Sequence, residues 1–134
     1  MNNSNSSKRE VITRRQVRGL MAALAVQFVL GVALTTLISY SPDKHSGVQT
    51  TFLVLHIIVA IGILIGVTIR LVLAVRWHSL QIPSAIGLLA SLGAFVCGVI
   101  ATKSGNDVAV FLMAIGFIIA FAAYGYSLGK LTNS

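Results

Sequence analysis

Residues 51–70, TFLVLHIIVAIGILIGVTIR, decide the fold of this chain. The stretch contains no ionisable group other than His56 until Arg70 closes it. It is continuously apolar rather than alternating, and about 20 such residues in helical form cross a hydrocarbon core about 30 Å thick. A helix also satisfies its own backbone hydrogen bonds in lipid. The stretch therefore predicts a transmembrane α-helix.

The rest of the chain repeats this composition. Of 134 residues, 56% are hydrophobic and 10% are charged, whereas soluble domains carry about 25% charged residues. The mean hydropathy is +0.90. We predict an all-α membrane protein, a four-helix up-down-up-down bundle with helices at about 17–39, 51–75, 83–101 and 108–128. The transmembrane domain, 17–129, is expected to lie between a disordered basic tail, 1–16, and a short tail, 130–134.

Small residues are expected to hold the helices together, because lipid tails are as apolar as leucine and association depends on close packing. Glycine and alanine recur at four-residue spacing in three of the four spans. The expected contact positions are Gly62 with Gly66, Ala90 with Ala94 and Gly98, and Gly125 with Gly129.

The distribution of Lys and Arg predicts the orientation. Eight of the ten lie in the N-terminal tail, around the second connection or at the C-terminus, and only Lys44 and Lys103 lie in the other two connections. By the positive-inside rule, both termini face the cytoplasm from the inner membrane. The formal charge of +7 then indicates affinity for anionic membrane lipids, with no nucleic-acid binding expected.

Polar residues inside the spans are the candidate functional residues, because they are costly in lipid. His56 lies about 8 Å below the expected outer end of its helix, and its imidazole either ligates haem iron or bonds a neighbouring helix. Gln27 is expected to bond across the bundle or to face a bound polar group. His45, in the outer loop, is a candidate second ligand. Arg70 is expected to snorkel to the cytoplasmic headgroups.

Several classes of chemistry are excluded by the residue inventory. Cys97 is the only cysteine, so no intrachain disulfide forms. The only acids are Glu10, Asp43 and Asp107, so the spans contain no carboxylate pair. Glycine-rich phosphate loops, HExxH, CxxC and GxSxG are absent. With no broken helix or charged midplane site expected, a transporter is not favoured.

Four segments resemble a known family. QFVLGVALTTLIS (27–39), SPDKHSG (41–47) and LHIIVAIGIL (55–64), with GNDVAVFLMAIGFIIAFAAY (105–124), resemble one four-helix half of the haem A synthase family. The resemblance implies that four-helix forms pair and that His56 stands at the family's helix-2 haem-ligand position. The chain departs from the family at helix 4, where 111–113 holds no ligand histidine. Leu53 also replaces a glutamate, and the loop cysteine pair is absent.

The departures limit what the resemblance implies for function. A six-coordinate haem would need His56 together with Met113, His45 or the His56 of the partner subunit. We therefore predict a haem-associated or respiratory-chain accessory membrane protein without catalysis of its own. The alternative is a cofactor-free structural or assembly subunit that docks onto a larger membrane complex. Either is expected to act as a homodimer or within such a complex.

Overall fold

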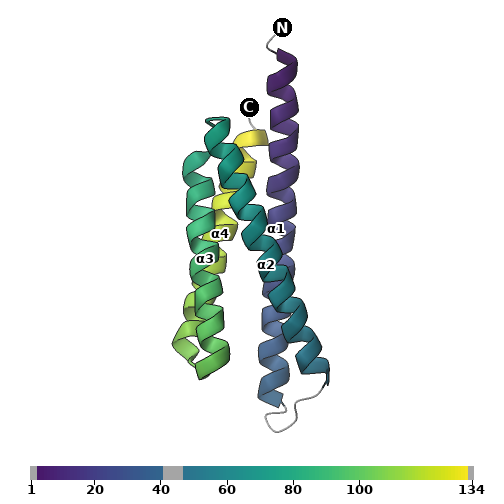
Figure 1. Cartoon of the computed structure of the whole chain (residues 1–134), viewed down its shortest axis with the longest axis vertical. Helices are drawn as coiled ribbons and strands as arrows, with labels where there is room; N and C mark the ends of the chain where they lie inside the picture. Colours follow the sequence, from purple (N-terminus) through teal and green to yellow (C-terminus); the bar gives the residue numbers. More distant parts are fainter. Residues whose placement is uncertain (1–2, 41–46, 133–134) are drawn as a thin grey trace.

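The chain forms four long helices (Figure 1). The computed structural model describes the backbone of residues 3–40 and 47–132 and the side chains of residues 7–36 and 47–132. The helices are α1 (Asn3–Tyr40), α2 (Gly47–Arg76), α3 (Gln81–Ser104) and α4 (Asp107–Thr132), and the described residues contain no strand. All four are long and apolar enough to cross a membrane, as predicted, and each is longer than the sequence indicated.

The N-terminal segment corrects one expectation. Residues 3–16 were expected to be disordered, but they form the first turns of α1, which extends beyond the other helices in Figure 1. Arg14 bonds Glu10 one turn earlier at 3.2 Å and also donates to the carbonyl oxygen of Leu131. The guanidinium of Arg9 lies 5.9 Å from the ring centroid of Trp77. Contacts with the end of α4 and with Trp77, just after α2, therefore order a segment whose composition favours disorder.

Each helix packs against its neighbours in sequence, and α4 packs against α1. Two close contacts show how α1 and α2 are aligned along each other. In the α1–α2 pair, Leu20 lies against Gly66 while Gly31 lies against His56, so these two helices run antiparallel. The start of α1 and the end of α4 lie at the same end of the bundle (Figure 1).

The buried residues form one narrow stripe on each helix. Spacings of three and four residues keep a single face towards neighbouring helices, as in left-handed helix packing. The stripes include 13, 17, 20, 24, 27 and 30 in α1, 63, 67, 70 and 74 in α2, 84, 87, 91 and 94 in α3, and 120, 124, 127 and 131 in α4. The remaining faces expose large apolar side chains, as a lipid environment allows.

The connection between α3 and α4 is built by local chemistry. Gly105 adopts a left-handed conformation with φ of 62°, and its N–H donates to the carbonyl of Ala101 at 2.9 Å. The Oδ1 of Asn106 accepts from the backbone N–H of Val108 at 2.9 Å. Asn106 therefore caps the N-terminus of α4.

The predicted small-residue contacts are confirmed in part. A methyl group at Gly66 would lie 2.8 Å from Leu20 Cδ2, and one at Gly125 would lie 3.9 Å from Met21 Cε. Nothing lies within 4 Å of such a group at Gly62 or Gly129. These two glycines face outward, so they contribute nothing to packing within the chain.

The expected stripe on α3 does contact α4. Ala90 and Ala94 lie against Gly116, and Gly98 lies against the sulfur of Met113. Gly116 was not among the expected contact positions, although Ala120 lies four residues after it and completes the same small-residue spacing.

Candidate functional site

His56 and Gln27 form a hydrogen bond between α2 and α1. Their Nε2 atoms lie 3.0 Å apart, and Gln27 is only 1% exposed. Because a carboxamide nitrogen only donates, this assignment makes Nε2 of His56 the acceptor and places the imidazole proton on Nδ1. The interhelical hydrogen bond expected for Gln27 is confirmed, and it joins the two polar residues that the sequence singled out separately.

The second imidazole nitrogen is enclosed. Nδ1 of His56 is buried and has no hydrogen-bond partner among the described residues. A methyl group at Gly31 would lie 3.3 Å from Cε1 and 3.8 Å from Nδ1, so the backbone of α1 covers this side of the ring. Gly31 therefore admits the imidazole between the helices, a role that no sequence motif indicated.

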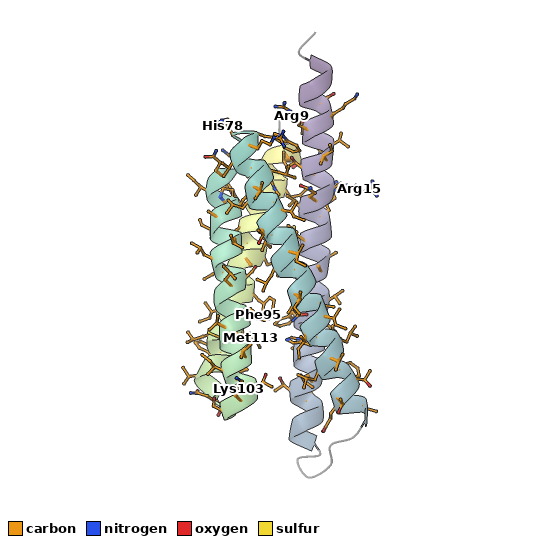
Figure 2. The ribbon with its side chains drawn as sticks, viewed as in Figure 1. Arg9, Arg15, His78, Phe95, Lys103 and Met113 are labelled. Atoms are coloured by element: carbon orange, nitrogen blue, oxygen red, sulfur yellow. The ribbon has the colours of Figure 1, made fainter. Side chains whose placement is uncertain are left out.

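This arrangement does not fit an axial haem ligand. One imidazole nitrogen is engaged by Gln27 and the other is covered by α1 at Gly31, so neither offers a free lone pair to iron. Met113 packs towards α3, where a methyl group at Gly98 would lie 3.1 Å from its sulfur (Figure 2). His45 lies outside the described residues, among which no three His, Cys, Asp or Glu side chains gather as a metal site.

Arg70 corrects a second expectation. It does not snorkel to the headgroups, because it is only 1% exposed and lies in the core. Its three guanidinium nitrogens have no hydrogen-bond partner among the described residues. His56, Ile63 and Arg70 are seven residues apart in succession, so they share one side of α2. That spacing was the sequence signal that could have placed Arg70 inside the bundle.

Tyr124, near the end of α4, is also fully buried between helices. A methyl group at Gly87 would lie 2.6 Å from its hydroxyl oxygen, so only glycine leaves room for the ring there. Tyr124 belongs to the same buried cluster as Val67, which lies one turn before Arg70 on α2, and its hydroxyl also has no hydrogen-bond partner among the described residues.

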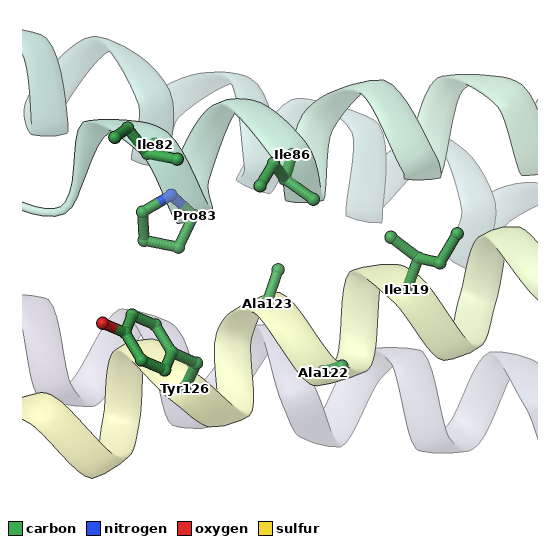
Figure 3. Close-up of a pocket in the computed structure, with 7 residues that line it drawn as sticks. All are labelled: Ile82, Pro83, Ile86, Ile119, Ala122, Ala123 and Tyr126. Atoms are coloured by element: carbon green, nitrogen blue, oxygen red, sulfur yellow. The ribbon is translucent and has the colours of Figure 1, made fainter.

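A hollow of about 330 Å³ lies between the start of α3 and the second half of α4 (Figure 3). Its lining residues are Ile82, Pro83, Ile86, Ile119, Ala122, Ala123 and Tyr126. Apart from the hydroxyl of Tyr126, these side chains carry no polar group. The hollow therefore has no chemistry to offer a reaction.

Comparison with protein-family models, curated proteins and solved structures finds no match to this chain. The resemblance to one half of haem A synthase stays a prediction from short motifs. Any assignment of function therefore depends on the geometry of the bundle.

Proposed function

We propose that this chain is a multi-pass protein of the cell inner membrane, an up-down-up-down bundle with both termini in the cytoplasm. Four apolar spans support the membrane location. The sidedness is supported by exposed basic residues at the end of the bundle where the chain begins and ends. Arg9 and Arg15 lie towards that end and Lys103 lies at the other (Figure 2).

Within that membrane, the proposed role is that of a cofactor-free structural or assembly subunit that docks onto a larger membrane complex. The alternative of a haem-associated accessory protein requires a free imidazole, whereas His56 is engaged by Gln27 and covered at Gly31. A histidine used in this way joins two helices, which is a structural use of a polar residue in lipid.

The observation that carries the docking role is a second regular stripe on α2, which faces away from the bundle. This α2 outer stripe consists of Ile58, Gly62, Ile65, Ile69 and Val72. Its spacing of four and three residues repeats that of the buried stripe, and Ile58 and Val72 are 60% and 59% exposed. Nothing approaches Gly62 within 4 Å. Gly62 leaves a gap between Ile58 and Ile65, and the stripe repeats every seven residues. An apolar transmembrane helix of a partner protein could therefore pack closely against it.

The docking role predicts that Gly62→Ile releases the chain from its complex. The added side chain fills the gap that a partner helix would occupy, so overpacking should weaken association at least about tenfold. The measurement is native electrophoresis of gently solubilised membranes, with the chain detected by a tag. Gly93→Ile is the matched control, because Gly93 is also exposed with nothing within 4 Å but lies on α3.

Wild-type chain should migrate in an assembly larger than one copy, Gly62→Ile mainly as free chain, and Gly93→Ile like wild type. Differently tagged copies that co-purify would identify the partner as a second copy of this chain. A wild-type protein that migrates only as free chain, or equal release by both variants, would contradict docking through the α2 outer stripe.

The same role predicts that the protein purified from haem-replete cells shows no Soret band, because Gln27 engages one ring nitrogen of His56 and α1 covers the other at Gly31. An absorption spectrum of the detergent-solubilised protein tests this directly. A stoichiometric band that disappears in His56→Ala would overturn the cofactor-free role and favour the haem-associated one. A weak band that persists in His56→Ala would show haem bound elsewhere, not at the imidazole.

A further inference from the structure

The charge of Arg70 has no counter-charge within the described part of the chain. The protein contains three acidic residues. Glu10 pairs with Arg14, and Asp107 begins α4 at the far end of the bundle from the α2–α3 turn near which Arg70 lies. Asp43 lies outside the described residues. The neighbours of Arg70 therefore come from α2 and the helices packed around it, none of which places a carboxylate beside it.

A buried guanidinium without a counter-charge requires a bound group to compensate its charge. Arginine stays charged in proteins, so it cannot escape the cost of burial by losing a proton. An unpaired charge inside a membrane bundle is costly, and such residues as a rule pair with another group or line a pathway. Because all three nitrogens of Arg70 lack partners among the described residues, the compensating group has to come from outside the described part of the chain.

The groups beside Arg70 indicate the chemistry of that ligand. Tyr124 lies in the buried cluster that contains Val67, one turn before Arg70, and its hydroxyl too has no hydrogen-bond partner among the described residues. Arg70 is on α2 and Tyr124 on α4, and these helices make no direct backbone contact, so the two buried side chains reach the core from different helices. The guanidinium of Arg70 and the hydroxyl of Tyr124 are donors without an acceptor, so a bound anion would satisfy them. Because they come from two helices, a group with three acceptor oxygens suits them better than a planar carboxylate does.

We propose that Arg70 and Tyr124 form an anion-binding site in the core of the bundle, which holds a phosphate group. The guanidinium fork binds two of the phosphate oxygens and the tyrosine hydroxyl donates to a third. Gly87 positions the tyrosine, since any side chain there would occupy the space of its ring. The source of the phosphate group is either free inorganic phosphate or an anionic lipid headgroup. The site is independent of the docking role.

Equilibrium dialysis of the purified, delipidated full chain against radiolabelled inorganic phosphate tests the site. We expect binding that Arg70→Gln weakens at least about tenfold, as loss of a charged hydrogen-bonding group should. Tyr124→Phe keeps the ring against Gly87 and should weaken binding about tenfold. Arg76→Gln is the matched control, because Arg76 is an exposed arginine six residues later on α2 and should leave the affinity unchanged.

A second arm separates the two sources. The delipidated protein is given phosphatidic acid or phosphatidylcholine, and retained lipid is measured by native mass spectrometry. Retention of phosphatidic acid that depends on Arg70, with no binding of inorganic phosphate, identifies a lipid headgroup, and the reverse identifies the free anion. Both results uphold the site.

The proposal is overturned if wild type binds neither probe, or if Arg70→Gln binds both as tightly as wild type does. If Arg70→Gln does not fold, Tyr124→Phe decides, and an affinity equal to that of wild type counts against the site. Failure of the docking role would be visible in the native electrophoresis of Gly62→Ile and would leave these binding results unaffected.

Discussion

Gly116→Ala is expected to destabilise the bundle by about 1–3 kcal/mol, although it adds a single methyl group. That group would lie 2.9 Å from the carbonyl oxygen of Ala90 and 2.9 Å from Cβ of Ala94, and 3.3 Å from Cα of Ala94. Backbone atoms cannot rotate away as the end of a side chain can. Helices α3 and α4 would therefore have to separate, which would loosen the packing along their whole contact.

Titration of the detergent-solubilised protein with a denaturing detergent, followed through the fluorescence of Trp77, measures this effect. Gly93→Ala is the matched control on α3, because nothing lies within 4 Å of a methyl group there. Alanine is the better helix former by about 1 kcal/mol, so the control should be neutral or stabilising. Equal destabilisation by the two variants would show that α3 and α4 do not meet at Gly116.

Gln27→Leu is expected to lower the stability by about 1–2 kcal/mol, because it leaves the imidazole of His56 buried with neither nitrogen paired. His56→Leu should lower the stability by a similar amount, because it leaves the buried carboxamide of Gln27 without its hydrogen-bond partner. The double variant Gln27→Leu/His56→Leu removes both polar groups and should recover most of the loss. The same unfolding titration gives all four stabilities.

The coupling energy between Gln27 and His56 should be about 1 kcal/mol, within the range measured for hydrogen bonds between transmembrane helices. The control cycle combines Gln27→Leu with Thr68→Val, because the exposed Thr68 hydroxyl bonds only within α2, to the carbonyl of Leu64 at 2.7 Å. That pair should be additive within about 0.5 kcal/mol. Additivity of Gln27 and His56 would mean that their hydrogen bond contributes nothing to stability.

The existence of the four spans could be predicted from the sequence because hydropathy over about 20 residues is a local property. The residues at which the helices begin and end could not be predicted in this way. Helix α1 begins at Asn3 although its first residues are polar, because Arg14 bonds Leu131 and Arg9 lies over Trp77. Those partners are distant in sequence and become neighbours only after the helices have packed.

At the candidate site too, the sequence identified the residues, whereas helix packing decided how they meet. His56 and Gln27 stood out in the sequence as polar residues in apolar spans, but nothing in the sequence paired them. The antiparallel register of α1 and α2 brings them within 3.0 Å and places Gly31 against the imidazole. The pairing engages the histidine that family resemblance would assign to haem iron.

The sequence by itself determined the number of helices, their apolar character and the bias of basic residues towards one end, because composition and length are enough for these. Only the tertiary structure decided which side of each helix faces inward. Arg70 and Tyr124 lie near the expected interface by sequence position, yet both are buried in the core. Rotation of a helix about its axis depends on packing with its neighbours, since an almost uniformly apolar span has no preferred face of its own.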